Sequence, residues 1–512
     1  MMEYNYLEDT LFHQEVKPRI GLGKIGIEKE SFRFANSEIS RSPHPKTLGS
    51  ALCNKFITTD FSESLLEFVT DPFESNNNTL EFLENIHLFV LDKLKDELLW
   101  PFSIPPYIKS EADIGIAEYG SSNIAKLKMI YRNGLSNRYG RVMQGISGIH
   151  FNYSLDPEMI KIIIDRERSK NNKISKSDIY FRMIRNLTRF NWLIIYLFGA
   201  SPAINRNFLG ENKSKYKKIK DMFVMEHSTS LRMSDIGYYV ADQQQLDIST
   251  KNLNRYLESL KKYTTLPNPK FNKIEENTNK YQSQISDAFL QIEDEYYSNI
   301  RPKSSLLSGE RMTSKLGKTG VDYIELRTLD VNPFKKAGIG MDDLKFLEAF
   351  MLFSTFLDSP EMTFGEVKLC RENDLHVSIN GRKQNLKLHN GEQRVLLKEW
   401  GLEILNLMQP IFDLLSLDYS LIRKYKMRIN DIDKTPSARL IKLIENHNGN
   451  YSDLAIKIAS KHKDEYQQKT KKNNQIQALL SGEVERSFKE QKELESSSFE
   501  SFNEYLSKYM NN

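Results

Sequence analysis

The chain has 512 residues, 39% of them hydrophobic, so it can bury a large core, and its length alone would allow two or three domains. Its 72 basic and 68 acidic residues nearly cancel, and the net charge of +4 does not indicate a dedicated nucleic-acid-binding protein. The two cysteines, Cys53 and Cys370, are far apart in sequence and outside any Cys-x-x-Cys or Cys/His cluster, which argues against a disulfide framework and a zinc site.

Targeting and membrane segments are not evident. The N-terminus carries acidic residues and no apolar signal-peptide core. The longest apolar run, residues 192–204, is interrupted by Gly199, Ser201 and Pro202 and is too short to span a bilayer. Together with the few cysteines, these features predict a soluble protein of the reducing cytoplasm.

The first informative element is an expected strand at residues 26–34, Gly-Ile-Glu-Lys-Glu-Ser-Phe-Arg-Phe. Side chains alternate along a strand, so Glu28 and Glu30 share one face, about 7 Å apart, while Ile25 and Ile27 point to the other. Two neighbouring carboxylates repel each other and are costly to bury alone, which favours a bound cation such as a hard divalent metal. The alternative is an exposed edge strand with a solvated charged face.

The next segment adds Asp60 and Glu67 as candidate oxygen ligands. For Asp60 the alternative is a helix N-cap, a position that aspartate favours. Asn78, with Glu81 three residues later, is expected to start a packing helix whose apolar stripe continues to about Trp100.

A basic helix is expected from Ile124, and most of its charged side chains are expected at the surface. These side chains are Lys126, Lys128, Arg132, Arg138 and Arg141, before Gln144. A second informative strand follows at residues 146–155, where apolar residues alternate with His150 and Asn152. A lone histidine is more often structural than a ligand, but here it shares a face with another polar group.

The middle of the chain is expected to contain a buried helix at residues 180–204 that ends near Gly199. Residues 205–220, rich in Lys and Asn, are expected to form a surface loop. A further helical stretch is expected from about residue 281, leading toward Tyr297.

Two polar segments of this region carry candidate binding residues. A turn near a glycine holds Arg232 and Tyr238, which is weak evidence by itself. Arg301 and Lys303 are expected in a loop, where two cations could approach phosphates.

The third informative strand is expected at residues 321–330. Its even-numbered residues from 324 to 328 form one face, largely apolar, and Glu325 and Arg327 share the other. A surface ion pair of little energetic consequence is the alternative reading of these two side chains.

The remainder of the chain is expected to be helical. Helices are expected at residues 346–357 and 399–415, with a polar interval at 371–391 between them, and a helix laid on the body is expected after about residue 461. Neither a dinucleotide-binding fingerprint nor a P-loop is present in the sequence.

If the three informative strands pair into one sheet, their polar faces meet on a concave surface. Five carboxylates and one histidine exceed the needs of one metal ion and match two or three Mg²⁺ or Mn²⁺ ions better than zinc. Such clusters handle phosphoryl transfer, in which an arginine neutralises charge on the transferred group.

Several motifs then occur in one order along the chain. They are residues 26–30 (Gly-Ile-Glu-Lys-Glu), 57–61 through 66–68, 119–123 (Tyr-Gly-Ser-Ser-Asn), 131–132, 137–140, 147–152 (Ser-Gly-Ile-His-Phe-Asn), 300–303 and 323–327 (Tyr-Ile-Glu-Leu-Arg). In these motifs the sequence resembles the glutamate–cysteine ligases of the proteobacterial type, from about residue 23 to 445. It departs from them at Lys29, Ser31 and Phe32, where relatives often carry Arg, Thr and Leu.

The resemblance implies an α+β fold similar to glutamine synthetase, with a curved antiparallel sheet that forms a bowl surrounded by helices. It implies a catalytic domain at residues 1–455 and a C-terminal helical extension at 456–512 packed on the same body. The implied activity is ATP-dependent ligation of L-glutamate to L-cysteine through a γ-glutamyl phosphate, with Mg²⁺ or Mn²⁺ as cofactor. A monomer without nucleic-acid or membrane partners is expected.

The resemblance also implies roles for single residues. One metal would be held by Glu30, Asp60 and Glu67, and a second by Glu28, His150 and Glu325. Arg327 would hold the transferred phosphoryl group, and Arg301 and Lys303 would approach the nucleotide. The substrate-facing residues would be Arg132, Gln144, Asn152, Arg232, Tyr238 and Tyr297, the last three on the cysteine side.

Two alternatives stay open on the sequence. One is another carboxylate–amine ligase, or a guanidine-kinase-like enzyme of the same fold, with a different acceptor. The other is a non-catalytic binding protein that uses the basic helix.

Overall fold

The structure is a computed structural model that describes residues 5–209, 213–276, 283–306, 309–469, 472–497 and 500–511. Its centre is an antiparallel sheet in the order β10-β11-β6-β1-β4-β3, with β2 and β5 paired to β1. The strands are β1 Lys24–Ala35, β2 Glu38–Ile39, β3 Ile57–Thr59, β4 Leu65–Val69, β5 Leu98–Leu99, β6 Gly148–Ser154, β10 Ile300–Lys303 and β11 Tyr323–Asp330. The three strands that the sequence singles out are β1, β6 and β11, and they lie side by side.

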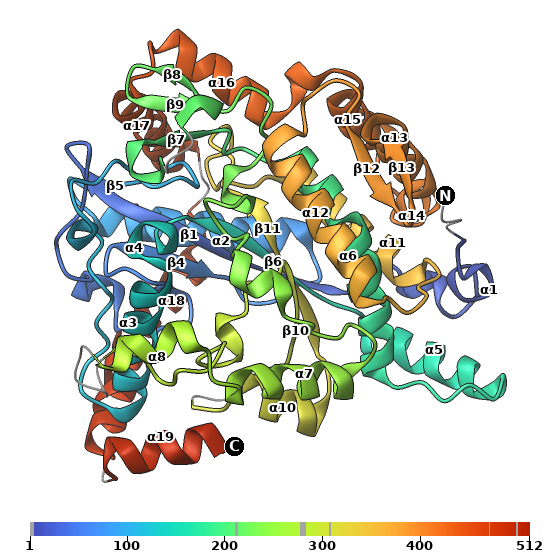
Figure 1. The fold of residues 1–512 in the computed structure, drawn as a ribbon, viewed down its shortest axis with the longest axis horizontal. Coiled ribbons are helices and arrows are strands. Elements are labelled where there is room, and N and C mark those ends of the chain that lie inside the picture. The colour runs from blue at the N-terminus through green and yellow to red at the C-terminus, as the bar shows by residue number, and fades with distance from the viewer. Residues whose placement is uncertain are drawn as a thin grey trace.

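One face of this sheet is apolar and is covered by helices. Ile27, Phe151 and Leu326 are at most 1% exposed and belong to the main core. The covering helices are α2 Asn76–Lys93, α6 Lys176–Phe198 and α11 Met341–Phe356, and Figure 1 shows them around the sheet. Because side chains alternate, the polar residues of β1, β6 and β11 point away from these helices.

The expected buried helix is confirmed as α6. The Ser175 side chain accepts a hydrogen bond from the Asp178 backbone N–H, and the Asp178 side chain accepts one in return, so both first-turn donors are satisfied. The helix ends at Gly199, where a Cβ atom would lie 2.5 Å from the carbonyl oxygen of Ile195. Only glycine fits this close approach.

The described residues also form two small sheets outside the centre. One is the hairpin of β12 Lys387–Asn390 and β13 Gln393–Leu396, and the other has the order β7-β9-β8. The latter consists of β7 Ala203–Asn205, β8 Lys217–Ile219 and β9 Met222–Val224. The prediction of a loop at 205–220 is therefore wrong in part. Lys217 and Lys218 are exposed on the edge strand β8, a place where lysines are common.

The boundaries of α2 differ from those expected. The helix starts at Asn76, because Ser75 accepts a hydrogen bond from the Asn78 backbone N–H and is the N-cap. It ends at Lys93, well before Trp100, since Lys95 has φ 50°, a left-handed conformation that does not continue a right-handed helix. The apolar stripe beyond this point belongs to β5.

Two predictions between residues 281 and 303 are also wrong. Residues 277–282 lie outside the described part, and from 284 to 292 the chain is not helical. Arg138 holds this segment through the Ala288 carbonyl, so tertiary hydrogen bonds replace helical ones. Arg301 and Lys303 lie in the strand β10 instead of a loop, and Pro302 is tolerated there because β10 is an edge strand.

The polar interval at 371–391 is partly helical. Helix α12 Phe364–Asn380 runs through its first half, capped by the Thr363 side chain. Its polar residues Asn373 and Asp374 are buried and hydrogen-bonded. Polar residues are usually exposed, so their burial could not be predicted from residue type alone. The expected helix at 399–415 is divided into α13 Leu397–Leu407 and α14 Gln409–Leu414.

The remaining α-helices complete the shell around the sheet (Figure 1). They are α1 Glu8–Leu11, α3 Asn123–Tyr139, α4 Arg141–Gln144, α5 Pro157–Ser169, α7 Leu253–Thr265, α8 Pro269–Glu276, α10 Met312–Thr319, α15 Tyr419–Asn430 and α16 Pro436–Asn446. Among the helices of the described residues, none combines the length and apolarity needed to cross a membrane.

The C-terminal residues form α17 Tyr451–Lys469, α18 Asn474–Ser496 and α19 Phe502–Asn511. Helices α17 and α18 contact α2, and the Ser487 hydroxyl accepts a hydrogen bond from the Ser50 backbone N–H. The boundary expected between 455 and 456 falls inside α17.

Candidate active site

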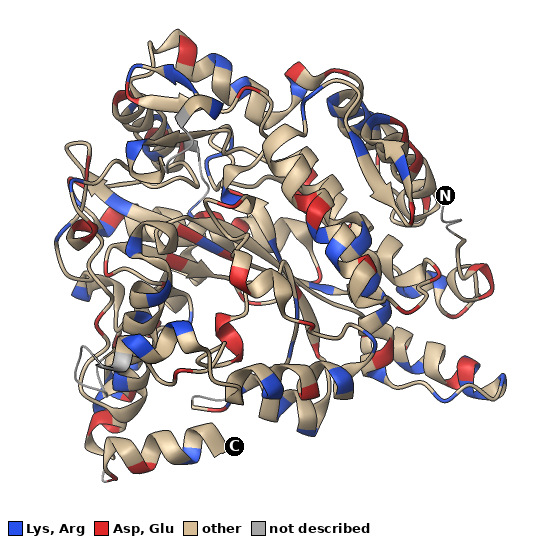
Figure 2. Ribbon diagram, viewed as in Figure 1, with Lys and Arg blue, Asp and Glu red and all other residues tan. Residues whose placement is uncertain are grey.

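Strand pairing gathers acidic side chains on the face of the sheet opposite the main core. Glu28 of β1 lies opposite His150 of β6, and Glu30 lies opposite Glu67 of β4. Residues directly opposite each other in an antiparallel pair project to the same side, so all four side chains share this face. Figure 2 shows acidic and basic segments next to each other on the central strands. We call this surface the acidic face.

Ion pairs centred on Glu325 occupy one part of the acidic face. The register of β11 on β6 places Glu325 opposite Asn152. Its carboxylate lies 2.7 Å from Arg327 Nη1 and 3.7 Å from Lys303 Nζ. His150 Nδ1 lies 3.3 Å from the same carboxylate. Despite burial, Arg327 and Lys303 hold the pKa of Glu325 well below its ordinary value.

His150 links this group to Glu28. Its Nδ1 atom lies 3.0 Å from Glu28 Oε2, and the Asn152 amide donates a 2.9 Å hydrogen bond to Glu28 Oε1. Burial and Arg327 act to lower the pKa of His150, but Glu28 and Glu325 outweigh them and raise it to about 9. The two carboxylates therefore favour the protonated form of the imidazole.

Among the described residues, the carboxylates of Glu30, Asp60 and Glu67 have one ion-pair contact, between Glu30 Oε1 and His150 Nε2 at 3.7 Å. Burial and repulsion from Asp60 raise the pKa of Glu30 to about 7. Burial, followed by repulsion from Glu28 and Asp60, raises the pKa of Glu67 to about 8. Within the part of the chain that the structure describes, neither Glu30 nor Glu67 forms an ion pair with a lysine or arginine. These acids repel one another, and a divalent cation would relieve the repulsion.

The donor atoms fit a divalent metal ion. Ligand atoms of Glu28, Glu67 and His150 lie within 4.8 Å of one another. Glu67 belongs to one of the two predicted metal sets, and Glu28 and His150 belong to the other. The two predicted sets therefore lie next to each other on one surface. His150 Nε2 and Glu325 Oε2 are buried without a hydrogen-bond partner among the described residues. An oxygen-rich set with a single imidazole suits Mg²⁺ or Mn²⁺.

The turn that carries Asp60 is fixed by two neighbours. The Tyr119 hydroxyl donates to the carbonyl oxygens of Thr59 and Asp60, and Arg132 Nε donates to the Asp60 carbonyl at 2.6 Å. The Arg132 guanidinium also lies 4.8 Å from the centre of the Tyr119 ring. Asp60 is therefore not a helix N-cap but part of the turn between β3 and β4. Arg132 Nη1 donates to the carbonyl oxygen of Lys128 one turn earlier in the same helix.

An aromatic pair borders the site. The rings of Tyr238 and Tyr297 are stacked with centroids 5.5 Å apart, and the Arg232 guanidinium lies 4.8 Å from the Tyr238 ring. The Tyr297 hydroxyl and the Gln144 side chain are 2.7 Å apart. Arg232 is fully buried and donates to the carbonyl oxygen of Arg327. The structure thus connects four predicted substrate residues to the strand that carries Arg327.

Arg301 is placed differently from Lys303. Both share the face of β10 that lies over Glu325. Lys303 reaches the carboxylate, whereas the Arg301 guanidinium donates to the carbonyl oxygens of Asp294 and Tyr296. Arg301 therefore supports the segment before β10.

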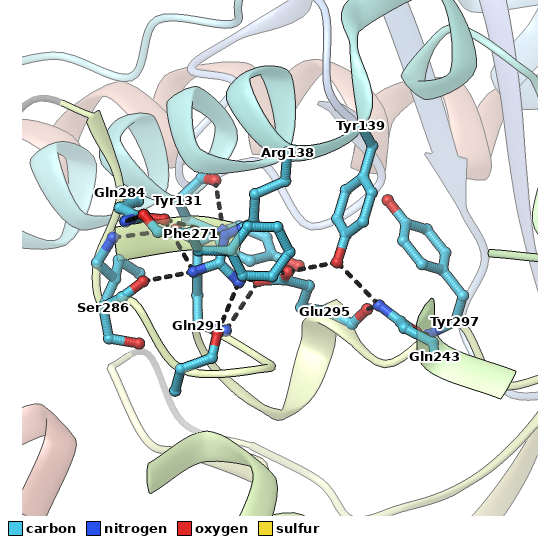
Figure 3. Close-up of polar contacts among 12 residues, drawn as sticks. Tyr131, Arg138, Tyr139, Gln243, Phe271, Gln284, Ser286, Gln291, Glu295 and Tyr297 are labelled. Atoms are coloured by element: carbon cyan, nitrogen blue, oxygen red, sulfur yellow. Dashed lines mark hydrogen bonds and ion pairs between the residues drawn. The ribbon is translucent and has the colours of Figure 1, made fainter. Parts of the chain in front are cut away.

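A buried polar network holds the segment that carries Tyr297. Arg138 Nη1 lies 2.8 Å from Glu295 Oε1, and neither side chain is exposed. Its other donors contact Gln284 and carbonyl oxygens, and Phe271 covers its guanidinium at 4.0 Å (Figure 3). The Glu295 carboxylate also accepts hydrogen bonds from the Tyr139 hydroxyl and from the backbone N–H of Gln291. We call this group the Arg138–Glu295 network.

The network reaches Tyr297 through Gln243. The Gln243 amide donates to Glu295 O and Tyr139 Oη, and its oxygen accepts a 2.8 Å hydrogen bond from the Tyr297 backbone N–H. Gly134 of α3 lets the network form, because a Cβ atom there would lie 2.0 Å from Gln291 Oε1. The prediction of a mostly exposed basic helix face is wrong for Arg138, and the pattern of the sequence does not single out Tyr139 or Gln243. The motif at 137–140 was the one signal for this region.

Comparison with known proteins identifies the fold and the family. The family model for glutamate–cysteine ligases matches residues 9–377. The glutamate–cysteine ligase of Pseudomonas putida is 39% identical over 89% of this chain and 88% of its own, and that of Aliivibrio fischeri is 38% identical over 94% and 95%. A crystal structure of the Francisella tularensis enzyme in complex with AMP superposes with a TM-score of 0.89, at 34% identity, over 96% of this chain and 97% of that one.

A more distant solved structure shares the fold alone. The bifunctional glutathione synthetase of Pasteurella multocida superposes with a TM-score of 0.67 at 24% identity and covers 90% of this chain and 54% of that one.

An antiparallel bowl with carboxylates and one histidine on its open face and helices behind it defines an enzyme of the glutamine-synthetase-like fold class. Within that class, the chain belongs to the glutamate–cysteine ligase family.

Proposed function

We propose that the acidic face is the active site at which this chain joins the γ-carboxylate of L-glutamate to the amine of L-cysteine, with conversion of ATP to ADP and phosphate. The chain is an enzyme of this reaction class, which begins glutathione biosynthesis. The observation that supports the location is the convergence of Glu28, His150 and Glu325 with Arg327 and Lys303 on one face of the sheet.

Charge explains why cations lie beside carboxylates here. The γ-carboxylate of glutamate is a poor electrophile and must approach ATP, which is itself an anion. Arg327 and Lys303 stand at the edge of the acidic face, where they can screen this repulsion. We assign the transferred phosphoryl group to Arg327, because a planar guanidinium binds phosphate oxygens in pairs.

The reaction then has two steps. In the first, a carboxylate oxygen of glutamate takes the γ-phosphoryl group of ATP, giving γ-glutamyl phosphate and ADP. In the second, the cysteine amine forms a bond to the activated carbonyl carbon and loses a proton, and the C–O bond to phosphate breaks. No thiol of the chain is required, in agreement with the burial of both cysteines, Cys53 and Cys370.

The same surface is proposed to hold divalent cations. One set of ligands would be Glu30, Asp60 and Glu67, and the other Glu28, His150 and Glu325. When bound, Mg²⁺ or Mn²⁺ would neutralise phosphate oxygens and position them for transfer. The mutual repulsion of Glu30 and Glu67 supports the first set, and the approach of His150 Nδ1 to the carboxylates of Glu28 and Glu325 supports the second.

Substrate contacts are proposed around this centre. Arg132, Gln144 and Asn152 would face glutamate and the acyl phosphate, and Arg232, Tyr238 and Tyr297 would border cysteine. AMP in the Francisella structure supports a nucleotide site in this chain. For that site Lys303 has better support than Arg301, whose guanidinium is occupied by backbone carbonyls.

Three further expectations belong to the proposal. The enzyme is proposed to act as a monomer in the cytoplasm, where ATP and reduced cysteine are available. Residues 1–455 are proposed as the catalytic domain and 456–512 as a helical extension. Continuity of α17 across this boundary supports an extension that packs on the same body.

The test is ADP release with ATP, Mg²⁺ and glutamate, with and without cysteine. We expect ADP and γ-glutamylcysteine to form together when cysteine is present. Equal turnover with unrelated amines would favour another carboxylate–amine ligase, and absence of turnover with every amine would contradict the proposal.

A further inference from the structure

A partly open cavity of about 80 Å³ lies behind the acidic face. It is bounded by α6, α7 and α12 and by the side of β10 that carries Ile300 and Pro302. These two residues alternate with Arg301 and Lys303, which face Glu325, so the cavity is on the other side of the strand. This volume is well below the roughly 300–1,000 Å³ of sites for drug-sized ligands, so the cavity suits an occupant of only a few non-hydrogen atoms.

Tyrosine rings form much of the cavity wall. They are Tyr238, Tyr239, Tyr256, Tyr296 and Tyr297. Aromatic faces carry negative charge density and attract organic cations when water is excluded. Gln243, which also lines the cavity, fixes the backbone of Tyr297 (Figure 3), so this part of the wall is preformed.

The polar atoms of the wall that lack partners are oxygen atoms. Asp374 is 7% exposed, and its Oδ2 atom accepts hydrogen bonds from Asn191 (2.7 Å) and Asn299 (3.0 Å). Its Oδ1 atom has no hydrogen-bond partner among the described residues, and the same is true of Gln244 Oε1 and Thr250 Oγ1. A buried acceptor without a donor is destabilising, so a ligand that brings N–H groups would be stabilised here.

The nearby cation does not neutralise Asp374. Arg371 donates to the carbonyl oxygen of Gln244 and to the Tyr296 hydroxyl instead. Burial raises the pKa of the Asp374 carboxyl to about 7, as expected for an acid that lacks an ion-pair partner. A positively charged donor would compensate the buried carboxylate.

We propose that this cavity binds a small primary ammonium compound, with its N–H groups on Asp374 and Gln244 and its carbon atoms against the tyrosine rings. The site is separate from the acidic face. It shares Tyr238 and Tyr297 with the proposed cysteine side.

The test uses n-butylammonium chloride as the probe on the full-length protein, with sodium chloride at equal ionic strength as the blank. Isothermal titration calorimetry should show saturable binding, and thermal unfolding should shift upward. n-Butanol has the same shape without charge, and tetramethylammonium is a cation without N–H donors. Both should bind at least about tenfold more weakly than n-butylammonium, since each lacks one of the two interactions.

Variants locate the site. Asp374→Asn keeps an oxygen for Asn191 and Asn299 but removes the charge, and should weaken binding about tenfold or more. The matched control is Glu348→Gln, because Glu348 is also buried and burial raises its pKa to about 7, but it lies in α11 and does not line the cavity. Val367→Phe places a ring into the cavity from α12 and should abolish binding even if Asp374→Asn fails to fold.

Three outcomes would overturn the proposal. They are the lack of saturable binding up to about 50 mM probe, equal binding by wild type and Asp374→Asn, and displacement of the probe by cysteine. The last result would make the cavity part of the acceptor site.

Discussion

The acidic face and the Arg138–Glu295 network are both buried polar clusters, but they differ in how far their atoms are paired. In the network, each N–H group of Arg138 has an acceptor and both carboxylate oxygens of Glu295 have donors. On the acidic face, Glu30 and Glu67 repel each other, and His150 Nε2 has no hydrogen-bond partner among the described residues, only an ion-pair contact with Glu30 at 3.7 Å. A fully paired cluster fixes structure, whereas an incompletely paired one is ready to receive a ligand.

The largest expected effect is on turnover from the acidic face. Glu28→Gln and Glu30→Gln should each lower kcat about 10³-fold or more, raise the Mg²⁺ requirement and leave the melting temperature nearly unchanged. The amide keeps the shape but binds a hard cation poorly. Steady-state kinetics and thermal unfolding on the same preparations measure this, with Glu348→Gln as the buried-carboxylate control. Near wild-type turnover in both variants would favour a solvated face without metal ions.

The next prediction separates two roles for Arg327. If its guanidinium contacts the phosphoryl group as it transfers, Arg327→Ala should lower kcat and kcat/KM together, by about 10³-fold. Arg327→Lys should recover part of the loss, because it keeps the charge without the planar fork. A destabilised Arg327→Ala protein with normal kcat would assign this residue to an ion pair with Glu325 alone.

Substitution in the Arg138–Glu295 network should lower stability and leave turnover largely intact, the opposite of the result expected on the acidic face. Arg138→Met leaves Glu295 buried without its cation, so the free energy of unfolding should fall by about 3–5 kcal/mol, while kcat of the folded fraction stays within a few fold of wild type. Urea unfolding and activity below the transition measure this. The double variant Arg138→Met, Glu295→Met should be less destabilised than the single one. A stable Arg138→Met protein with no activity would move Arg138 into the catalytic machinery.

A smaller effect concerns pH and metal ions. In the folded metal-free chain, the pKa values of Glu30 and Glu67 are about 7 and 8, above the ordinary value of 4.5, because of burial and mutual repulsion. Between about pH 4.5 and pH 8 the folded protein therefore binds more protons than the unfolded protein. The free energy of unfolding should fall as the pH rises through this range. Excess Mg²⁺ should reduce this fall, because it replaces the protons. Melting temperatures that do not depend on pH in EDTA would contradict the repulsion.

The smallest effect is expected from the cysteines. Cys53 and Cys370 are buried, and burial raises the pKa of the Cys53 thiol to about 11. Because an acyl phosphate and not a thioester is the proposed intermediate, the Cys53→Ser, Cys370→Ser variant should still make γ-glutamylcysteine at a similar rate. Its product is measured by chromatography. Loss of activity in a variant with native circular dichroism would contradict the mechanism.

The sequence predicts which face of a strand each side chain occupies, because side chains alternate between the two faces along any strand. Ile27 and Glu28 point to opposite sides in any register, and the same holds for His150 and Phe151. It does not predict that Glu30 lies opposite Glu67, since the pairing of distant strands depends on their turns and packing. The order β11-β6-β1 could therefore not be predicted from the strand patterns alone, and it follows from the structure or from the resemblance to a known family.

Burial of charge was the harder part to predict. Lys126 and Arg138 occur in the same helix, yet Lys126 is exposed and Arg138 is buried. What distinguishes them is the segment around Glu295, which has no periodic pattern in the sequence. Arg301 was misplaced for the same reason, because its partners are backbone carbonyls and carry no signal in the sequence.

The order of strands in the sheet also has a consequence for synthesis on the ribosome. Strand β1 ends at Ala35 and β11 begins at Tyr323, so at about 5–20 residues per second roughly 15–60 s separate them. During this interval Glu28, Glu67 and His150 can meet while Arg327 and Lys303 have not yet been made. The nascent acidic face lacks its cations until the last of its strands is added, so the site is completed late in translation.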